Sequence, residues 1–269
     1  MLNFTKMNGA GNDFIMVDNR QQTLHFTNAQ IARLCDRHRG IGADGLLAVE
    51  PSQHGADVRM RYYNADGGEV EMCGNGARCF ARYVQKIIGG GGRPSLSFET
   101  QAGQLSASYE GELVRLAMSN PHSLALNARL PVADTTLDVH FINTGVPHAI
   151  VIVDDLENTP IVKWGAALRY HEHFAPKGTN ANFMKVLRPN HIAIRTYERG
   201  VEDETLACGT GMVASALVHH LLHGATGPVS VDVRGGDTLH IGFTASGHEF
   251  TDVTLTGPAD FVFDGQVSV

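Results

Sequence analysis

The chain has 269 residues, 43% of them hydrophobic and 18% charged, which is typical of a soluble globular protein with one large or two medium domains. A formal net charge of −7 argues against broad electrostatic attraction to nucleic acid or anionic lipid. No apolar run is long enough to span a membrane, and the N-terminal segment lacks a secretory pattern. We therefore expect a cytoplasmic protein whose four cysteines are thiols.

The first part of the chain predicts strands and glycine turns around a short helix. Residues 4–18 indicate strand, turn and strand, and Asn12 in the turn is equally compatible with a purely local role and with a side chain facing a pocket. Residues 28–37 indicate a helix, and the glycine-rich segment 39–45 is interpreted as a tight turn because its spacing does not fit a nucleotide-binding loop. The alternating segment 58–64 predicts a strand that ends in a turn at 64–68.

The segment 71–78, Glu-Met-Cys-Gly-Asn-Gly-Ala-Arg, precedes a predicted amphipathic helix over residues 77–88. Four glycines at 89–92 are expected to end this helix. Residues 96–118 then predict an antiparallel ribbon, and Asn120-Pro121 is a candidate domain boundary.

The second half repeats the first. It contains the segment 206–212, Leu-Ala-Cys-Gly-Thr-Gly-Met, followed by an apolar helix over 212–222. The remaining elements are a helix over 161–173 and strands over 137–143, 149–153, 182–186, 192–197, 229–233, 239–243, 252–256 and 261–263. Two histidine pairs, 171/173 and 219/223, are interpreted as polar helix positions, and no metal site is expected.

Both halves therefore carry Cys-Gly-polar-Gly at the start of a helix, with a glutamate four residues upstream of each cysteine at Glu69 and Glu204. The repeat of roughly 130 residues is too long for a solenoid unit. It predicts an α+β protein of two similar domains of mixed strands, each with a helix inside its sheet layers.

The position of Cys73 and Cys208 at helix starts has two chemical consequences. The first turn of a helix has unpaired N–H groups and a partial positive charge, which favour a thiolate and also bind a carboxylate. If two such helix starts face each other, the sulfurs lie on either side of the carbon beside a bound carboxylate. One thiolate can then remove the proton of an amino-acid α-carbon while the other thiol protonates the opposite face, without any cofactor.

Five segments together resemble the diaminopimelate epimerase family: 8–14, 63–67, 71–78, 197–200 and 207–211. The match runs in order through nearly the whole chain, and the two cysteine motifs together are highly specific. The resemblance implies two pseudo-symmetric domains of mixed and antiparallel sheet, each wrapped around a central helix, with the active site in the cleft between them. It places residues 1–120 plus about 258–269 in the first domain and 121–257 in the second.

The resemblance also implies cofactor-independent, two-base epimerisation of LL-diaminopimelate to meso-diaminopimelate, in lysine and peptidoglycan precursor synthesis. An amino acid is then the expected partner, and a homodimer is one assembly we consider. By motif, Cys73 and Cys208 are the catalytic pair, and His148 and Glu198 support their protonation. The residues expected to bind substrate are Asn12, Asn64, Gly74, Asn75, Asn180, Glu198, Arg199, Gly209 and Thr210.

Two positions depart from the family pattern. Gly-Asn-Pro-His is here Gly145-Val146-Pro147-His148, so an asparagine that would contact substrate is replaced by valine, and many members have glutamine where this chain has Gly45. Asn143 and Thr144 are candidates to replace the lost amide. The departures leave the two-thiol chemistry unchanged and bear on recognition of the distal end of the substrate.

Two other functions fit part of the pattern. One is a two-cysteine racemase of another amino acid on the same fold, such as proline, hydroxyproline or histidine. The other is a thiol redox sensor, since paired reactive thiols oxidise readily, although the Cys-x-x-Cys spacing of redox pairs is absent.

Overall fold

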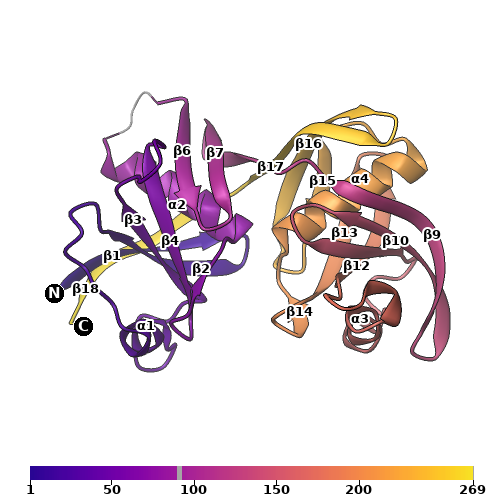
Figure 1. Ribbon diagram of the computed structural model, residues 1–269, viewed down its shortest axis with the longest axis horizontal. Coiled ribbons are helices and arrows are strands. Elements are labelled where there is room, and N and C mark those ends of the chain that lie inside the picture. The colour runs from indigo at the N-terminus through magenta and orange to yellow at the C-terminus, as the bar shows by residue number, and fades with distance from the viewer. Residues whose placement is uncertain (90–92, 269) are drawn as a thin grey trace. The chain divides into compact units, whose positions relative to one another are not determined.

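The computed structural model describes residues 1–89 and 93–268, and the chain forms two compact units of strands and helices (Figure 1). Unit 1 contains residues 1–116 and the chain from residue 257 onwards, and unit 2 contains residues 117–256. The last strand, β18 (Asp260–Val267), pairs antiparallel with the first strand, β1 (Leu2–Gly9), so the two ends of the chain meet in unit 1.

Unit 1 is a mixed sheet in which β1, β2, β3, β4, β6, β7 and β8 follow one another as hydrogen-bonded neighbours. The pairs β2–β3 and β4–β6 are parallel and the other neighbouring pairs are antiparallel. Helix α1 connects β2 to β3, and helix α2 connects β5 to β6. The bounds are β2 (Asn12–Asp18), α1 (Asn28–Cys35), β3 (Gly45–Glu50), β4 (Val58–Asn64), β5 (Glu69–Val70), α2 (Gly74–Ile87), β6 (Ser95–Thr100), β7 (Gly103–Glu110) and β8 (Leu113–Ala117).

Unit 2 has the same pattern of pairing. The pairs β11–β12 and β13–β15 are parallel, the other neighbouring pairs are antiparallel, and helices α3 and α4 take the places of α1 and α2. The bounds are β9 (His122–Val132), β10 (Thr135–Asn143), β11 (Pro147–Ile152), α3 (Ile161–Arg169), the 3₁₀ helix η1 (Glu172–Phe174), β12 (Asn180–Arg188), β13 (His191–Glu198), β14 (Asp203–Thr205), α4 (Gly209–His223), β15 (Val229–Asp232), β16 (Thr238–Ser246) and β17 (Glu249–Gly257).

The two units are equivalent strand for strand. β1 to β7 correspond in order to β10 to β16, and a further antiparallel strand, β18 or β9, lies outside the first strand of each set. This confirms the predicted α+β architecture of two pseudo-symmetric halves.

The long helix of each unit is buried. In α2 the residues from Asn75 to Ala81 are all buried, and in α4 so are those from Gly211 to His219. Helix α4 is apolar over Met212–Val218 except at Ser215, and a helix of this kind is stable only when covered on all sides. Gly76 lets α2 lie close to its sheet, because a Cβ atom there would be 3.2 Å from Leu47 Cδ1 and 3.3 Å from Phe14 Cζ.

The structure changes several predicted boundaries. Helices α2 and α4 begin three residues earlier than predicted, directly after the cysteines, because the glycine-containing turns are themselves the first helical turns. Helix α3 ends at Arg169 rather than His173, and the residues after Tyr170 form η1. Strand β9 was not predicted from the sequence. Of the glycine run expected to end α2, residues 90–92 lie outside the described part of the chain.

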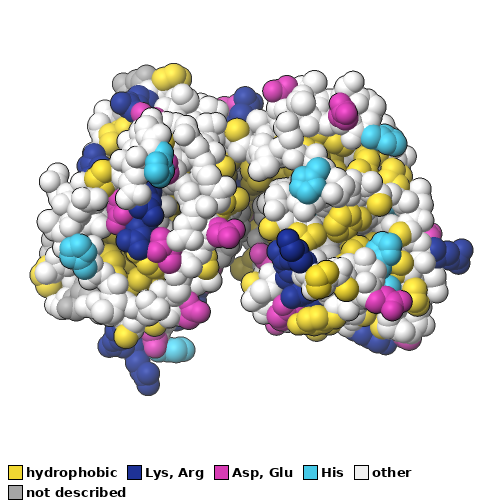
Figure 2. Space-filling model, in the orientation of Figure 1, with side chains coloured by type: hydrophobic (Ala, Val, Ile, Leu, Met, Phe, Trp, Pro, Cys, Tyr) yellow, Lys and Arg dark blue, Asp and Glu magenta, His cyan; other side chains and the backbone are white. Residues whose placement is uncertain are grey.

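Opposite charges are interleaved at the surface. Ion pairs such as Arg20–Asp18 at 2.7 Å and Lys163–Asp134 at 2.9 Å join neighbouring side chains. On the face drawn in Figure 2, basic and acidic side chains are both scattered, singly or in small groups. Within residues 1–89 and 93–268, every helix is too short or too polar to cross a bilayer.

We expect Gly165→Ala to destabilise unit 2 by about 1–3 kcal/mol, the usual cost of overpacking. Gly165 lies in α3, and an added Cβ atom would be 2.4 Å from the Tyr197 Cβ atom on β13. The measurement is denaturant unfolding followed by circular dichroism. The control is Lys163→Ala in the same helix, whose side chain is 56% exposed and whose loss should change stability by less than about 0.5 kcal/mol.

Candidate active site

Cys73 and Cys208 are the N-cap residues of α2 and α4. Each has extended backbone angles (φ −138° and −119°), and each backbone carbonyl accepts the first helical hydrogen bond, from Ala77 N at 2.8 Å and from Met212 N at 3.0 Å. In neither helix does the cap side chain bond the first-turn N–H groups, and neither first turn contains an acidic residue. Both helix starts therefore combine a thiol with N–H groups suited to an anion.

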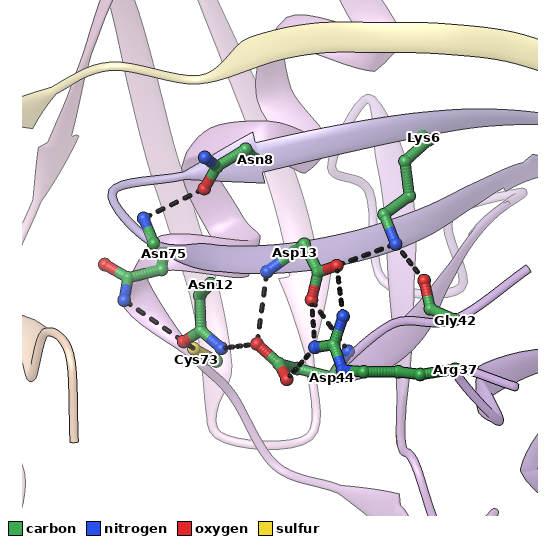
Figure 3. Close-up of polar contacts among 10 residues, drawn as sticks. Lys6, Asn8, Asn12, Asp13, Arg37, Gly42, Asp44, Cys73 and Asn75 are labelled. Atoms are coloured by element: carbon green, nitrogen blue, oxygen red, sulfur yellow. Dashed lines mark hydrogen bonds and ion pairs between the residues drawn. The ribbon is translucent and has the colours of Figure 1, made fainter. Parts of the chain in front are cut away.

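In unit 1 the thiol of Cys73 lies beside an amide whose orientation is fixed (Figure 3). Asn12 Nδ2 donates to Asp44 Oδ2 at 2.5 Å, so Asn12 Oδ1 faces the helix. That oxygen accepts from Asn75 Nδ2 at 3.2 Å and lies 3.9 Å from Cys73 Sγ, with the thiol as donor. An acceptor in this position favours the protonated thiol.

Asp44 is held in turn by a cluster of charges (Figure 3). Arg37 bonds Asp44 Oδ1 at 2.7 Å and Asp13 Oδ1 at 2.8 Å, while Lys6 lies 2.7 Å from Asp13 Oδ2. Burial alone would raise the pKa of Asp13, but hydrogen bonds from Arg37 and Lys6 hold it well below its usual range. The cluster keeps Asp13 ionised and holds the Asp44 carboxylate in place, which fixes the amide of Asn12.

Arg78, in the second turn of α2, is fully buried. Its guanidinium donates to Asn75 Oδ1 at 3.1 Å, to Gly9 O at 3.3 Å and to Pro258 O at 3.1 Å. It therefore ties α2 to the β1–β2 turn and to the segment before β18. Its positive charge near the helix start favours an anion there, opposing the effect of Asn12 Oδ1 on the thiol.

In unit 2 the thiol of Cys208 lies beside a hydroxyl group. Thr210 Oγ1 is 3.7 Å from Cys208 Sγ and 2.9 Å from His148 Nε2. His148, on β11, is fully buried, and its other ring nitrogen is 3.0 Å from Asn182 Nδ2. Burial, assisted by the charge of Arg199, lowers the pKa of His148 from 6.5 to about 3, so the imidazole is neutral.

This burial predicts a pH dependence of stability. Between about 6.5 and about 3 the unfolded chain binds a proton at residue 148 that the folded chain does not, so stability falls as the pH is lowered, by at most about 1.4 kcal/mol per pH unit. We expect His148→Gln to show a shallower fall from about pH 6.5 to about pH 5 in denaturant unfolding. The exposed His54→Gln should keep the parental slope, and equal slopes in all three proteins would contradict the assignment.

The structure brings only some of the other predicted residues into these two groups. Asn180 uses both ends of its amide on backbone groups, donating to Pro147 O at 3.0 Å and accepting from Arg199 N at 2.8 Å. It therefore positions the segment that carries Arg199, whose guanidinium donates to Lys177 O at 3.3 Å. Burial raises the pKa of Glu198, with the Thr205 hydroxyl opposing the shift, so its carboxyl group is biased towards the protonated form.

Asn64 and the glycine-containing first turns complete the predicted set. Asn64 is half-buried at the end of β4, directly across from Gly45 on β3. Gly74 and Gly209 are the first residues of their helices. An added Cβ atom at Gly45 would be 2.5 Å from Tyr63 O, so this backbone accepts no larger side chain without movement of β4.

Asn143 and Thr144, the candidates to replace the amide lost at Val146, both make local hydrogen bonds. Asn143 Oδ1 accepts from Gly145 N at 3.0 Å, and the buried hydroxyl of Thr144 donates to Thr210 O at 2.9 Å. Thr144 thus anchors the first turn of α4.

Sequence reasoning missed three side chains that organise these groups: Asp44, Arg78 and Asn182. Asp44 lies in the predicted glycine turn 39–45, and Arg78 lies in the cysteine segment 71–78 at the start of a predicted helix. A charged residue in each of these positions could have indicated a role in the site. Asn182 lay in a predicted strand and carried no signal, since its role depends on strand register. Among the described residues, no group of three or more His, Cys, Asp or Glu side chains is arranged to hold a metal ion.

Solved structures identify the class of fold. A phenazine biosynthesis protein of the PhzF family from Bacillus anthracis aligns with 100% of this chain and 99% of its own, with a TM-score of 0.73 and 17% identity. A probable proline racemase from Agrobacterium radiobacter K84 aligns with 100% of this chain and 93% of its own, with a TM-score of 0.70 and 17% identity. At these identities the likeness establishes the shared two-part fold.

Sequence comparison identifies the family. The family model described as diaminopimelate epimerase matches residues 4–122 and 140–262. The diaminopimelate epimerase of Chlorobaculum tepidum is 42% identical over 268 residues, covering 98% of this chain and 100% of that protein. That of Aquifex aeolicus is 40% identical over 281 residues, covering 99% and 98%. The chain belongs to the diaminopimelate epimerase family.

Proposed function

We propose that this protein interconverts LL-diaminopimelate and meso-diaminopimelate, a step in lysine and peptidoglycan precursor synthesis. The observation that carries the proposal is the duplicated helix start, in which Cys73 and Cys208 are each the N-cap residue of a buried helix and neither cap side chain bonds a first-turn N–H group. Membership of the family supports the choice of substrate.

In the proposed reaction the α-carboxylate binds the N–H groups of the two first turns, Gly74-Asn75 and Gly209-Thr210. One cysteine thiolate removes the α-proton, the carbanion's charge spreads into the carboxylate, and the other thiol protonates the opposite face. Helix N-termini stabilise this charge as it develops, which is the main contribution required of the protein. The reaction requires the two sulfurs to reach opposite faces of one carbon atom, and it needs no cofactor.

The remaining predicted residues act at the periphery of this reaction. Asn12 orients Cys73, and His148 acts on Cys208 through Thr210. Arg199 binds the distal carboxylate as a bidentate partner, and Asn64, Asn180 and Glu198 contribute to distal recognition. Glu198, with its carboxyl biased towards the protonated form, can donate a hydrogen bond to the distal group or to a thiolate.

A substrate panel tests the proposal. Purified protein is incubated with LL-diaminopimelate, meso-diaminopimelate, L-proline and trans-4-hydroxy-L-proline, and the stereoisomers are separated by chiral chromatography. We expect interconversion of the two diaminopimelates alone. Turnover of proline or hydroxyproline alone would replace the proposal with a mono-amino-acid racemase. Absence of all turnover, together with reversible formation of a Cys73–Cys208 disulfide, would favour the redox-sensing alternative.

The proposal also includes a cytoplasmic location and a homodimeric assembly. Both are measurable independently of activity, by cell fractionation and by light scattering of the purified protein.

A further inference from the structure

A continuous chain of polar side chains runs through the buried interior of unit 2 to Cys208. Thr196 Oγ1 donates to Asn182 Oδ1 at 3.0 Å, and Asn182 Nδ2 lies 3.0 Å from His148 Nδ1. His148 Nε2 lies 2.9 Å from Thr210 Oγ1, which lies 3.7 Å from Cys208 Sγ. Thr196, Asn182 and His148 are each at most 2% exposed, so the protein itself determines the direction of these hydrogen bonds.

The contacts of Asn182 determine which groups in this chain donate hydrogen bonds and which accept them. Its Nδ2 atom lies 3.1 Å from Ala149 O, and a backbone carbonyl only accepts hydrogen bonds. The NH₂ group of the amide must therefore be on this side, and its oxygen must face the hydroxyl of Thr196. One N–H goes to Ala149 O, and the second points at the ring of His148.

The orientation of the amide then fixes the tautomer of His148. Because Asn182 Nδ2 can only donate, His148 Nδ1 must accept, and the ring proton is on Nε2. The charged group that acts on this ring is Arg199, which together with burial disfavours a second proton. Glu198, the neighbouring acid on β13, is itself biased towards its uncharged form.

The tautomer of His148 determines whether the Thr210 hydroxyl can donate a hydrogen bond to Cys208 Sγ. His148 Nε2–H donates to Thr210 Oγ1, so the hydroxyl proton of Thr210 is left to point elsewhere, and Cys208 Sγ lies within reach. With the other tautomer, Nε2 would accept this proton and the hydroxyl would turn away from the sulfur. A hydrogen-bond donor beside a sulfur stabilises the thiolate over the thiol.

We propose that Asn182 is a positioning residue, which fixes the tautomer of His148 and thereby makes the Thr210 hydroxyl a hydrogen-bond donor to Cys208. The inference deepens the proposed function, because it rests on the role of Cys208 as a proton-transferring group. In unit 1 the corresponding neighbour of Cys73 is the acceptor Asn12 Oδ1, so the two thiols have opposite hydrogen-bonding partners.

Strand register and a glycine place Asn182 in this position. On β12 it pairs with Thr196 of antiparallel β13 and with Ile150 of parallel β11, which brings its side chain beside Ala149 and His148. Gly211 leaves room for it, since a Cβ atom at Gly211 would be 2.3 Å from Asn182 Oδ1. Gly211, the last glycine of the second cysteine motif, therefore makes space for the side-chain amide of Asn182.

The tautomer is read directly by NMR of protein containing ¹⁵N-labelled histidine, with the His148 signals assigned from the His148→Gln variant. We expect the unaltered protein to carry the proton on Nε2 and none on Nδ1. Asn182→Ala should spread the proton over both nitrogens, whereas Thr210→Val should leave Nδ1 unprotonated because Asn182 is still present. Asn190→Ala, on the turn between the same two strands, is the control and should change nothing.

The effect on the sulfur is read from the ultraviolet absorbance of the thiolate during a pH titration, in a Cys73→Ser background. Burial raises the pKa of Cys35 to about 11 and that of Cys79 to about 12, so the signal at lower pH belongs to Cys208. We expect Thr210→Val to move the titration midpoint upward by about one pH unit, Asn182→Ala to move it in the same direction, and Thr210→Ser to leave it unchanged.

Because the two residues act through one hydroxyl group, Asn182→Ala should add nothing to Thr210→Val. A proton on Nδ1 in the unaltered protein, or an unchanged tautomer in Asn182→Ala, would overturn the proposal. So would a shifted tautomer with an unmoved Cys208 midpoint, or additive shifts in the double variant. If Asn182→Ala does not fold, Asn182→Asp takes its place. Its side chain places an acceptor where Asn182 has a donor, so a proton should then appear on His148 Nδ1. None of these readouts requires turnover, so a failure of the epimerase proposal would be seen separately in the substrate panel.

Discussion

Replacing Cys208 by alanine is expected to lower turnover of diaminopimelate by at least about 100-fold and by up to about 10⁴-fold, the range over which a positioned general acid or base contributes. Cys73→Ala should have an effect of the same size, because each direction of the reaction uses one sulfur as base and the other as acid. The measurement is the initial rate of epimerisation by chiral chromatography, starting separately from the LL and the meso isomer.

Cys35→Ala is the matched control. Cys35 is 3% exposed in α1, away from both cysteine motifs, and its pKa is raised to about 11 by burial, so it is a packed, unreactive thiol. This variant should keep its parent's turnover. Full activity in either Cys73→Ala or Cys208→Ala would contradict the two-base account.

The second large effect expected is on stability. Arg78→Met should destabilise unit 1 by about 2–4 kcal/mol, because it leaves the Gly9 and Pro258 carbonyls and Asn75 Oδ1 without a charged donor. Part of this cost is offset, since the buried guanidinium no longer has to be desolvated. Chemical denaturation followed by circular dichroism measures the change.

Arg20→Met provides the comparison for this experiment. Arg20 forms a bidentate pair with Asp18, but both side chains are 36% exposed, and such surface pairs contribute about 0–1 kcal/mol. If the two arginine variants proved equally stable, Arg78 would not be the tie between α2, the β1–β2 turn and the segment before β18 that its contacts indicate.

Much of the architecture was predictable because it repeats. The same Cys-Gly-polar-Gly turn occurs twice, and in each case the structure has a helix starting at the next residue, within the same order of parallel and antiparallel pairs. The periodic apolar residues of α2 also predicted which face of that helix is buried. Boundaries were less accurate where glycine or polar residues hold regular structure, as at the first turns of α2 and α4.

Strand β9 shows a different limit. Its pairing with β10 shifts register twice, near Val139 and near Phe141, and Asn127 within it has a positive φ of 58°. Leucine, alanine or valine nevertheless occupies every second position from 124 to 132, and these are the more buried positions, so the two-residue alternation was present in the sequence. Asn127 and Pro131 interrupt that run with residues that disfavour strands, which is why the strand was not predicted.

The site divides in the same way. Cys73, Cys208 and the residues of their turns were identifiable, because the chemistry depends on local sequence at a helix start. Asn182 was not, since its function comes from the register of three strands that meet only in the folded chain. The role of Asn180 also became clear only from its partners, because an amide in a motif can bind substrate or backbone with equal ease.

The most direct test of the two-base account is the fate of hydrogen when the reaction is run in heavy water and stopped early. With two cysteines acting from opposite faces, the meso product should carry deuterium at its inverted α-carbon, delivered by a solvent-exchanged thiol, while the recovered LL substrate remains largely unlabelled. Product that retains the original hydrogen at that carbon would show that one group removes and returns the same proton, and the account of Cys73 and Cys208 as an acid–base pair would be wrong.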